Sequence, residues 1–386
     1  MPGSSRNPLL GEEHEMLRAQ VRRFVETEVK PVAERWETDG FVPRPILRRA
    51  GELGFLGLRY PTEYGGSAMD PLASVILGEE LGRSTFGGFA ITILDHTDMA
   101  AVHILHSGSK AQKERWLPRV VDGSAWSAVA ITEPDAGSDV KGIRTRARRD
   151  GDHWVIDGTK CFITNGVLAD VYCVAVKTNP EGGSRSVSML LVEKGTPGFR
   201  VARKFDKMGW RSSDMAELVF EGARVPAENV IGDEGRGFYA LMQNFQNERL
   251  VLGAQAVGEM LAALELTLDY VTTRKAFGAT LFEKQVVRNR LALLATKVEA
   301  ARALVYTTAA AYGQGQDCTR EVSMVKALCG ELVNEVMYQC LQLHGGSGYM
   351  TGSVIERMAR DARAHPLGGG ATDVMLEEVA KRLVRT

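Results

Sequence analysis

The chain has 386 residues, more than one ordinary hydrophobic core accommodates, so its length predicts two or three packed units. Hydrophobic residues make up 44% and charged residues 25%, as in folded soluble proteins, and a net charge of −1 disfavours nucleic-acid and anionic-membrane partners. Five scattered cysteines without C-x-x-C spacing favour a reducing compartment. Since neither a secretory signal nor an apolar run of roughly 20 residues is recognised, the expected location is cytoplasmic, although a presequence could already have been removed.

Helical periodicity dominates the first third of the chain. Apolar residues recur near helical spacing over 12–36, where Pro31 is expected to kink or end the helix. Further helical patterns follow at 45–54, 71–81 and 92–106, separated by Gly-rich turns such as 64–67. The sequence therefore predicts an N-terminal all-α domain over residues 1–124.

Short β-branched or alternating runs replace the helical pattern in the middle of the chain. They lie at 154–156, 171–176, 188–192 and 216–220, separated by Gly-containing pairs that are typical of turns. This spacing predicts an antiparallel sandwich or barrel over residues 125–234. No G-x-G-x-x-G follows a strand, so a Rossmann dinucleotide site is not expected.

Helical periodicity returns in the last part of the chain, at 238–273, 284–312, 320–343 and 355–363. Four helices joined by short connections indicate a bundle, which we place at residues 235–386. The predicted fold class is therefore an α+β multidomain protein, with an all-α domain, an antiparallel β domain and a C-terminal four-helix bundle in that order.

Two segments of the predicted β domain carry groups suited to a flat, polar-edged ligand. The loop 130–139 offers hydroxyls and main-chain N–H groups, although an ordinary surface loop is the better interpretation of this pattern alone. In the segment 160–166, Phe162 and Thr164 share one face of a strand, while Cys161 and Ile163 point to the other. An aromatic beside a hydroxyl could cover a planar ring, but many half-buried strands show the same pattern.

Taken together, these two segments resemble the flavin-binding signature of the acyl-CoA dehydrogenase family. Residues 274–278 (Arg-Lys-Ala-Phe-Gly) resemble the segment that reaches across a dimer to the neighbouring FAD. Residues 342–349 resemble the family's Gly-rich turn, and 368–373 resemble the loop and helix start that line the thioester pocket. The resemblance runs over roughly residues 12–385 and is nearest to the long-chain and isovaleryl-type branch.

The resemblance implies an FAD-dependent oxidoreductase of fatty acid β-oxidation that dehydrogenates an acyl-CoA and passes electrons to an electron-transfer flavoprotein. It also implies a homotetramer, a dimer of dimers, with FAD between the β domain and the bundle. The implied FAD-binding residues are Ile131 and Thr132 at the isoalloxazine, Gly137 and Ser138 at the phosphate, Phe162 and Thr164 beside the ring, Arg274 and Phe277 from a second subunit with Gln342 and Gly346 at the ADP half, and Ala371 and Asp373.

The expected reaction needs a base for the α-proton of the thioester. In many family members this base is a Glu near the C-terminus, but the matching place here is 368–371, which holds three glycines and an alanine. In the long-chain and isovaleryl branches the base lies early in the first bundle helix, where this chain has Glu248. Glu248 also follows Phe245 and Leu241 by three and seven residues on one apolar stripe, where a carboxylate is rare unless paired or functional. We therefore predict Glu248 as the catalytic base.

Burial is expected to raise the pKa of Glu248, by up to about 3–5 units for full burial. The resemblance implies that the N–H of Gly369, with a flavin ribose hydroxyl, polarises the thioester carbonyl. Ser138, Arg249 and Gly369 are the predicted substrate-binding residues. An ion pair between Glu248 and Arg249 is the structural alternative, although adjacent helical residues point about 100° apart.

Other interpretations remain open at this point. Asp95-His96 and His344 are taken as structural or pocket-lining, and no metal site is predicted. An acyl-CoA oxidase, a branched short-chain acyl-CoA dehydrogenase, a flavin monooxygenase of similar fold, and a non-catalytic flavin- or DNA-binding relative are the alternatives. The length favours a dehydrogenase over the longer oxidases, and the balanced charge disfavours DNA binding. The residues of segments such as 203–209 resemble those of the long-chain type, so a medium to long fatty acyl-CoA is the expected substrate.

Overall fold

The N-terminal region of the computed structural model, which describes residues 7–179 and 181–383, is a group of helices interrupted by two π-helical turns. The predicted break at Pro31 is confirmed, because the first helix passes through a π-turn and ends before the proline. The segment predicted as one helix over 92–106 is wrong in detail, since a second π-turn separates two short helices there. The elements are α1 (Glu12–Phe24), η1 (Val25–Val29), α2 (Ala33–Asp39), α3 (Arg44–Glu52), η2 (Thr62–Tyr64), α4 (Pro71–Gly82), α5 (Gly87–Leu94), η3 (Asp95–Ala100), α6 (Val102–Ser107) and α7 (Lys110–Val121).

The middle region is a seven-stranded sheet with the strand order β1-β4-β2-β3-β7-β6, in which β5 pairs with β4. The four predicted strand runs all lie within strands, but the sequence patterns missed β1, β2 and β6. The sheet is mixed, because β1 pairs with β4 in parallel, so the purely antiparallel prediction was wrong there. The strands are β1 (Ser127–Ala130), β2 (Arg146–Asp150), β3 (His153–Thr164), β4 (Val171–Lys177), β5 (Val187–Glu193), β6 (Phe199–Lys204) and β7 (Met215–Pro226).

The C-terminal region is built on three long helices, α8 (Gly237–Thr273), α9 (Gln285–Gly313) and α10 (Thr319–His344). The small hairpin of β8 (Lys275–Ala276) and β9 (Ala279–Thr280) joins α8 to α9. After α11 (Gly346–Tyr349), the fourth position of the bundle is shared by α12 (Val354–Ala362) and α13 (Thr372–Ala380), which both pack against α10. The helix start implied by the resemblance of residues 368–373 is present, because α13 begins at Thr372, and the glycines of that segment separate α12 from α13.

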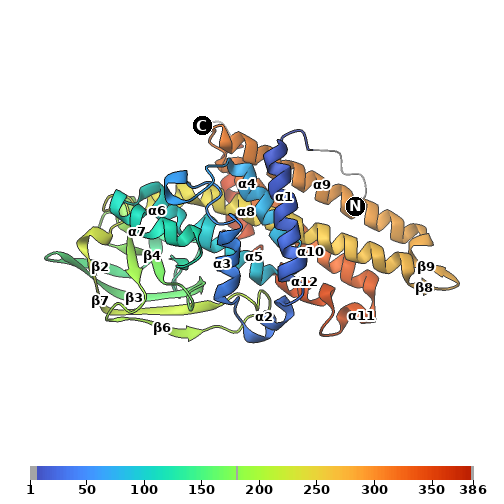
Figure 1. The fold of residues 1–386 in the computed structure, drawn as a ribbon, viewed down its shortest axis with the longest axis horizontal. Helices are drawn as coiled ribbons and strands as arrows, with labels where there is room; N and C mark the ends of the chain where they lie inside the picture. Colours follow the sequence, from blue (N-terminus) through green and yellow to red (C-terminus); the bar gives the residue numbers. More distant parts are fainter. Residues whose placement is uncertain (1–6, 180, 384–386) are drawn as a thin grey trace.

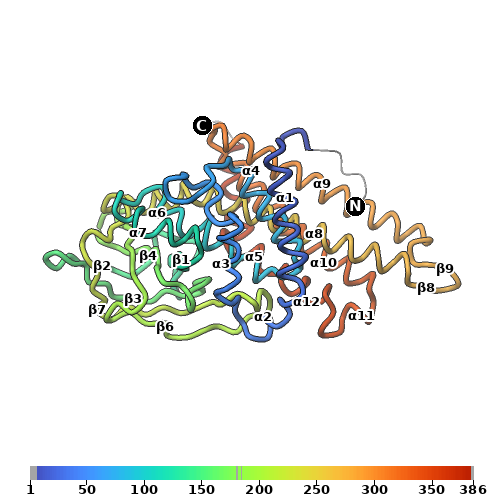
Figure 2. The backbone as a smooth tube through the Cα atoms, viewed as in Figure 1, coloured from blue at the N-terminus to red at the C-terminus, as the bar shows by residue number. Residues whose placement is uncertain are grey.

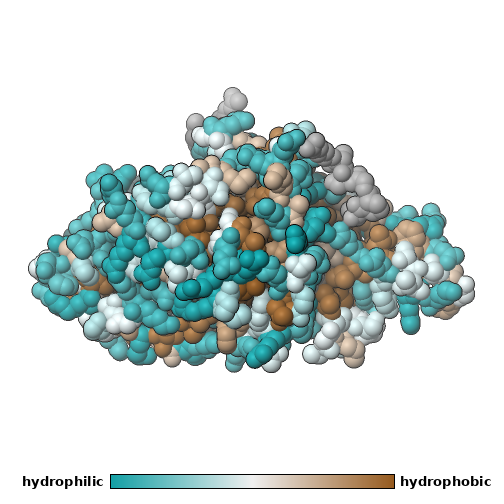
Figure 3. All heavy atoms as spheres, viewed as in Figure 1, coloured by the Kyte–Doolittle hydropathy of each residue, from teal (hydrophilic) through white to brown (hydrophobic). Residues whose placement is uncertain are grey.

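The three regions follow one another along the molecule, with the sheet at one end, the N-terminal helices in the middle and the free end of the bundle opposite (Figures 1 and 2). Helix α8 passes through the centre and packs against α4, α9 and α10. It is long and apolar enough to cross a membrane, but 89% of its most apolar window is buried inside the fold, as in a core helix. On the face drawn in Figure 3, hydrophilic residues dominate and hydrophobic ones are seen mainly between them in the central part.

Candidate active site

Glu248 lies on the first half of α8, where the helix passes between the N-terminal helices and the bundle. Leu241 and Leu252 on its side of the helix are buried, and Phe245 is half-buried, as the apolar stripe predicted. The carboxylate forms no hydrogen bond or ion pair with any residue of the described chain, including its neighbour Arg249. Burial raises the pKa of Glu248 above its usual range, while the charges of Arg249 and Lys326 oppose this rise.

Two buried asparagines fix the turn of α8 that carries Glu248. Asn247 donates through Nδ2 to the main-chain oxygen of Asp98 at 2.9 Å, and its Oδ1 accepts from Arg59. Asn244 binds His106 and the buried His103 through its amide group. These bonds hold α8 against η3 and α6, and they fix the turn of the helix from which Glu248 projects.

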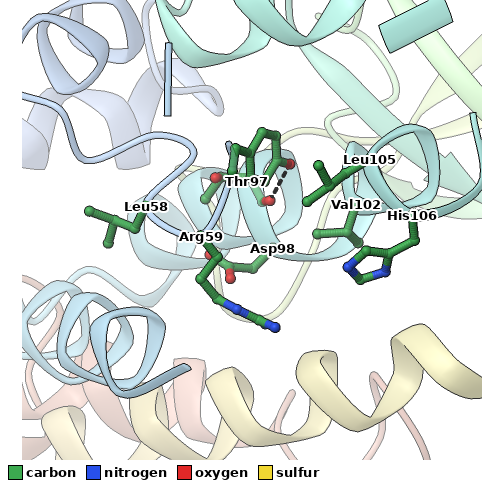
Figure 4. Close-up of a pocket in the computed structure, with 8 residues that line it drawn as sticks. Leu58, Arg59, Thr97, Asp98, Val102, Leu105 and His106 are labelled. Carbon is green, nitrogen blue, oxygen red and sulfur yellow. Dashed lines mark hydrogen bonds between the residues drawn. The ribbon is translucent and has the colours of Figure 1, made fainter. Parts of the chain in front are cut away.

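A cavity of about 30 Å³ lies beside these asparagines, between the N-terminal helices and α8. Figure 4 shows Arg59, Asp98 and His106 around it, above the pale-yellow ribbon of α8. Its volume suits about two water molecules, and its lining offers them charged and polar partners. The cavity is part of the polar contact between the N-terminal helices and the turn of α8 that carries Asn244 and Asn247.

The Gly-rich turn between α12 and α13 brings Gly369 against Glu248. A side-chain carbon on Gly369 would lie 3.2 Å from Oε1 of Glu248 and 2.3 Å from Cδ1 of Leu252. The backbone of Gly369 has φ +65°, a left-handed conformation that glycine adopts without strain. The structure therefore places the predicted base and the predicted oxyanion donor side by side, with no room for a larger residue at position 369.

The predicted flavin loop after β1 is held on β3 by a buried ion pair that sequence reasoning missed. The ammonium of Lys160 lies 2.8 Å from Oε1 of Glu133 and also donates to the main-chain oxygen of Ile131 at 2.9 Å. A main-chain bond of 2.9 Å from Cys161 to Thr132 adds a second tie. Gly137 and Ser138, further along this loop, are exposed. Neither Lys160 nor Glu133 has a periodicity that would have predicted the pair.

Phe162 and Thr164 lie at the end of β3 on its more exposed side, as predicted. Phe162 sits in an irregularity of the pairing between β3 and β7, and its φ of +58° is a strained conformation for a residue with a bulky side chain. The residue is 58% exposed, and its ring lies against that of Phe205, just after β6, with centroids 5.1 Å apart and planes tilted by 41°. A strained backbone that presents an aromatic face and a nearby hydroxyl fits a flat ring with polar edges, as the isoalloxazine of FAD has.

Asp95 connects this end of β3 with the base. Its Oδ2 accepts a bond of 3.2 Å from Nδ2 of Asn165, the residue after Thr164. Burial, followed by the charges of Glu248 and Asp214, raises the pKa of Asp95 well above its usual range. The π-turn η3 therefore lies within electrostatic reach of Glu248 and in contact with the strand end. π-Turns inside helices are common at functional sites.

Four of the predicted cofactor residues lie far from this cluster, at the free end of the bundle. Arg274 and the 97% exposed Phe277 belong to the hairpin after α8, while Gln342 and Gly346 lie where α10 ends. The stacked rings of Tyr270 and His344 hold these two ends together. Figure 1 shows this end of the bundle opposite the sheet, so one chain does not bring these four residues to Phe162.

The remaining predicted residues surround Glu248 or the flavin loop. Ile131 and Phe245 belong to one apolar cluster, which brings the loop against the start of α8. Ala371 is half-buried and Asp373 is exposed, both just after the glycine turn. Arg249 is half-buried over the Phe245 ring, 5.5 Å from its centroid, and its buried Nε has no hydrogen-bond partner among the described residues.

Lys326 on α10 is a buried charged residue beside Glu248. Like the pair of Lys160 and Glu133, it was not predicted from the sequence. Its side chain is 2% exposed, and its charge lowers the pKa of Glu248. The signal was available, because Lys326 follows Val322 by four residues and precedes Cys329 by three, on an apolar stripe like that of Glu248.

Comparison with known proteins covers all three regions of the chain. Family models match the N-terminal domain of acyl-CoA dehydrogenase at residues 11–124, its middle domain at 128–223 and its C-terminal domain at 235–384. The chain is 39% identical over 378 residues to the mitochondrial long-chain specific acyl-CoA dehydrogenase of Rattus norvegicus, which is 97% of this chain and 87% of that protein. It is 35% identical over 369 residues to the mitochondrial isovaleryl-CoA dehydrogenase of Pongo abelii, which is 95% of this chain and 87% of that protein. A solved acyl-CoA dehydrogenase from Geobacillus kaustophilus superposes with a TM-score of 0.94 at 39% identity, over 98% of this chain and 100% of that chain.

Proposed function

Since the chain belongs to the acyl-CoA dehydrogenase family, we propose that it dehydrogenates a medium to long fatty acyl-CoA to the trans-2-enoyl-CoA, with Glu248 as the base. The observation that carries this proposal is the contact between the unpaired, partly buried carboxylate of Glu248 and the turn at Gly369. A charged group that has no structural partner and faces a glycine-lined space is available for a proton transfer.

In the proposed reaction, Glu248 takes the proton from Cα of the thioester. A raised pKa brings the carboxylate nearer to the basicity that a general base needs at neutral pH. The Cα proton is still far less acidic than a carboxyl group, so the thioester oxygen must be stabilised as charge develops on it. The main-chain N–H of Gly369 is the proposed donor, because the φ of this residue sets the direction of its peptide groups independently of the flanking helices. Ser138 and Arg249 are the other proposed substrate contacts.

FAD is the proposed cofactor, and when bound it accepts the hydrogen of Cβ with its electron pair. The residues that would hold its ring are Ile131, Thr132, Phe162 and Thr164, and Gly137 and Ser138 would meet its phosphates. Ala371 and Asp373 would approach it from the glycine turn. The exposed, strained Phe162 supports this assignment, because such a conformation persists in a fold when the surroundings or a ligand stabilise it.

A homotetramer, built as a dimer of dimers, is the proposed assembly. The separation of Arg274, Phe277, Gln342 and Gly346 from the strand end supports it, because a second copy can bring this end of the bundle to the first copy's cofactor. An electron-transfer flavoprotein is the proposed electron acceptor, and the cytoplasm is the proposed location.

An anaerobic titration tests the proposed reaction and its substrate class together. The purified, FAD-loaded protein is mixed with straight-chain acyl-CoAs from butyryl to palmitoyl and with isovaleryl-CoA, and the visible flavin band is recorded. We expect stoichiometric bleaching by the medium to long straight chains, and little by isovaleryl-CoA. Bleaching by isovaleryl-CoA alone would contradict the substrate class, and a flavin that no acyl-CoA bleaches would contradict the reaction. Rapid reoxidation of the bleached flavin by air would identify an oxidase instead of a dehydrogenase.

A further inference from the structure

Lys326 makes contacts that are unusual for a buried lysine. Its ammonium donates to the main-chain oxygens of His365 and Gly370, the latter at 3.0 Å, and forms no ion pair with a described residue. Burying an ammonium group costs free energy unless it is paired and hydrogen-bonded. Packing alone therefore does not explain a lysine at this position. The two oxygens lie on either side of residues 366–369, and one cation therefore closes this turn.

The closed turn is the one that carries Gly369. Its own main-chain bonds are few, with Gly368 and Leu367 donating to Ala364 and Thr372 donating to Pro366. Gly369 and Gly370 have positive φ values of +65° and +108°. Their main-chain N–H groups donate no hydrogen bond within the described chain. Lys326 is thus a principal fixed point of the turn at its C-terminal side.

The same lysine adjoins the base. A side-chain carbon on Gly369 would lie 3.6 Å from Cε of Lys326 and 3.2 Å from Oε1 of Glu248, so all three residues meet at one point. The geometry points to Lys326 as a positioning residue for proton abstraction: it holds the turn so that Gly369 faces the thioester, and its charge keeps Glu248 ionised. This role rests on the proposed function, in which Glu248 is the base.

The charges around the pair are few. Glu248 faces Arg249 on its own helix, Lys326 on α10 and Asp95 on η3. Lys326 faces Glu248 and Arg249 on α8, and Cys329 and Glu331 on α10. The groups of the turn that bind Lys326 are main-chain oxygens. The ring of His365 does not bind it, because this ring is hydrogen-bonded to Glu259 at 2.9 Å. Lys326 is therefore one of only two cations here that favour the ionised form of Glu248.

The charge of Lys326 should affect both limbs of the pH profile of kcat/KM. Burial lowers the pKa of Lys326 to about 8, while Glu248 opposes this fall. In the wild-type enzyme, kcat/KM should rise with pH as Glu248 ionises and fall again near pH 8 as Lys326 loses its proton. Replacing the lysine with a neutral side chain removes the attraction that lowers the pKa of Glu248, so the acidic limb should move to higher pH.

The test compares the FAD-loaded variants Lys326→Met and Lys326→Arg with the wild type and with Lys110→Met, a control whose side chain is 85% exposed on α7. For Lys326→Met we expect an acidic midpoint higher by about one unit, kcat/KM at pH 7 lower by about tenfold or more, and no basic limb near pH 8. Lys326→Arg should keep the wild-type acidic midpoint and also lack the basic limb, because arginine does not deprotonate. A folded Lys326→Met enzyme with the wild-type pH midpoint would overturn the inference, as would a Lys326→Arg enzyme that keeps the basic limb.

A second readout does not depend on turnover. Hydrogen exchange of the peptide that covers 364–372 should be about thirtyfold faster in Lys326→Met than in Lys110→Met, since the turn loses two hydrogen bonds. Unchanged exchange would overturn the inference even if activity fell. Faster exchange in a protein whose flavin no acyl-CoA bleaches would instead place the error in the proposed function and keep the lysine as the closure of the turn.

Discussion

At the scale of single residues, the site depends on a glycine that meets a glutamate. Gly369 has a left-handed backbone, and the atoms nearest to a side chain there are Cδ1 of Leu252 at 2.3 Å and Oε1 of Glu248 at 3.2 Å. Gly368, one residue earlier, has only the Ala364 oxygen at 3.8 Å. Two adjacent glycines in one turn therefore differ sharply in how much space surrounds them.

We predict that Gly369→Ala lowers kcat/KM by about 10²-fold, because the new methyl group displaces Glu248 and the turn from their reacting positions. The left-handed backbone adds about 1–2 kcal/mol of destabilisation. Steady-state kinetics and urea unfolding measure the two effects. Gly368→Ala is the matched control, and a loss of similar size in this control would show that the turn tolerates no side chain at all, contrary to the specific contact at 369.

The sequence could predict individual site residues only where they stood out from a periodic pattern. Glu248 interrupts an apolar stripe, and Phe162 and Thr164 share one side of a strand, so their placement agreed with expectation. Lys326 interrupts a stripe in the same way, but its partners are main-chain oxygens, which leave no trace in side-chain identity. The strained φ of Phe162 was also not predictable, since it arises from a pairing irregularity that involves a distant strand.

At the scale of elements, the flavin loop is fastened to its strand by the pair of Lys160 and Glu133. The side chains are 0% and 6% exposed, and Glu133 also accepts from the main-chain N–H of Thr145 at 2.9 Å. Burial lowers the pKa of Lys160 to about 8, while Lys160 holds the pKa of Glu133 below its usual range against the effect of burial. The loop therefore depends on a cation that the interior accommodates only because of its partner.

Lys160→Met should destabilise the protein by about 3–5 kcal/mol, because it leaves the charge of Glu133 buried without a cation. We expect the variant to retain less FAD, since Ile131 and Thr132 lose their support. The double variant Lys160→Met/Glu133→Gln should be less destabilised than the single one. Urea unfolding and the flavin-to-protein absorbance ratio measure these effects, with the exposed Arg148→Met as control. Additive losses in the double variant would argue against the pair as the fastening.

Helices and strands could be predicted where the sequence has a long helical periodicity or a run of β-branched residues. The helices α9 and α10 repeat buried apolar residues at helical spacing over many turns, and the strands β4 and β5 are continuous buried apolar runs, so both patterns were clear. Strand β2, with the sequence RARRD, carries mostly charged residues and has an exposed pattern, so its pairing with β3 and β4 identifies it as a strand and its sequence does not. The π-turn η3 interrupts the helical pattern of 92–106, and it packs against α8 and β1, which are distant in the sequence.

At the scale of the whole molecule, one carboxylate joins all three regions. Asp361 on α12 accepts from the main-chain N–H of Trp210 at 2.6 Å, between β6 and β7, and from that of Gly87 at 3.1 Å, at the start of α5. Burial, followed by the charge of Glu37, raises the pKa of Asp361 to about 8. The folded protein therefore holds this proton more tightly than the unfolded chain does.

This shift predicts a pH-dependent junction. With a folded pKa of about 8 and an unfolded value of 3.8, the stability from Asp361 is full below pH 3.8 and is lost as pH rises to about 8. Asp361→Asn removes the titrating group, at a pH-independent cost because its amide nitrogen cannot accept from a main-chain N–H. Its free energy of unfolding relative to that of the wild type should therefore rise by about 3 kcal/mol between pH 5 and pH 8. Urea titrations at both values measure this, with the exposed Asp269→Asn as control. A constant difference between variant and wild type would contradict the raised pKa.

The proposed cofactor site, shared between two subunits, predicts complementation between them. A Phe162→Ala variant and an Arg274→Glu variant should each retain little FAD. The first substitution removes a contact to the flavin ring in every site, and the second removes a contact to the ADP half. In a mixed dimer, one site carries both defects and the other carries neither, so co-expression should restore on the order of a quarter of the sites. The bound flavin of the co-purified mixture measures this. Recovery no greater than the sum of the two separate variants would mean that both residues act within one chain.

A single-turnover comparison tests whether Glu248 takes the α-proton. FAD-loaded wild type, Glu248→Gln and the control Asp269→Asn on the same helix are mixed anaerobically with the acyl-CoA that bleaches the wild type, and the rate of flavin bleaching is followed. We predict that Glu248→Gln keeps its FAD and its fold but bleaches at least about 10²–10⁴-fold more slowly, while Asp269→Asn matches the wild type. A Glu248→Gln enzyme that bleaches at the wild-type rate would show that another group takes the proton.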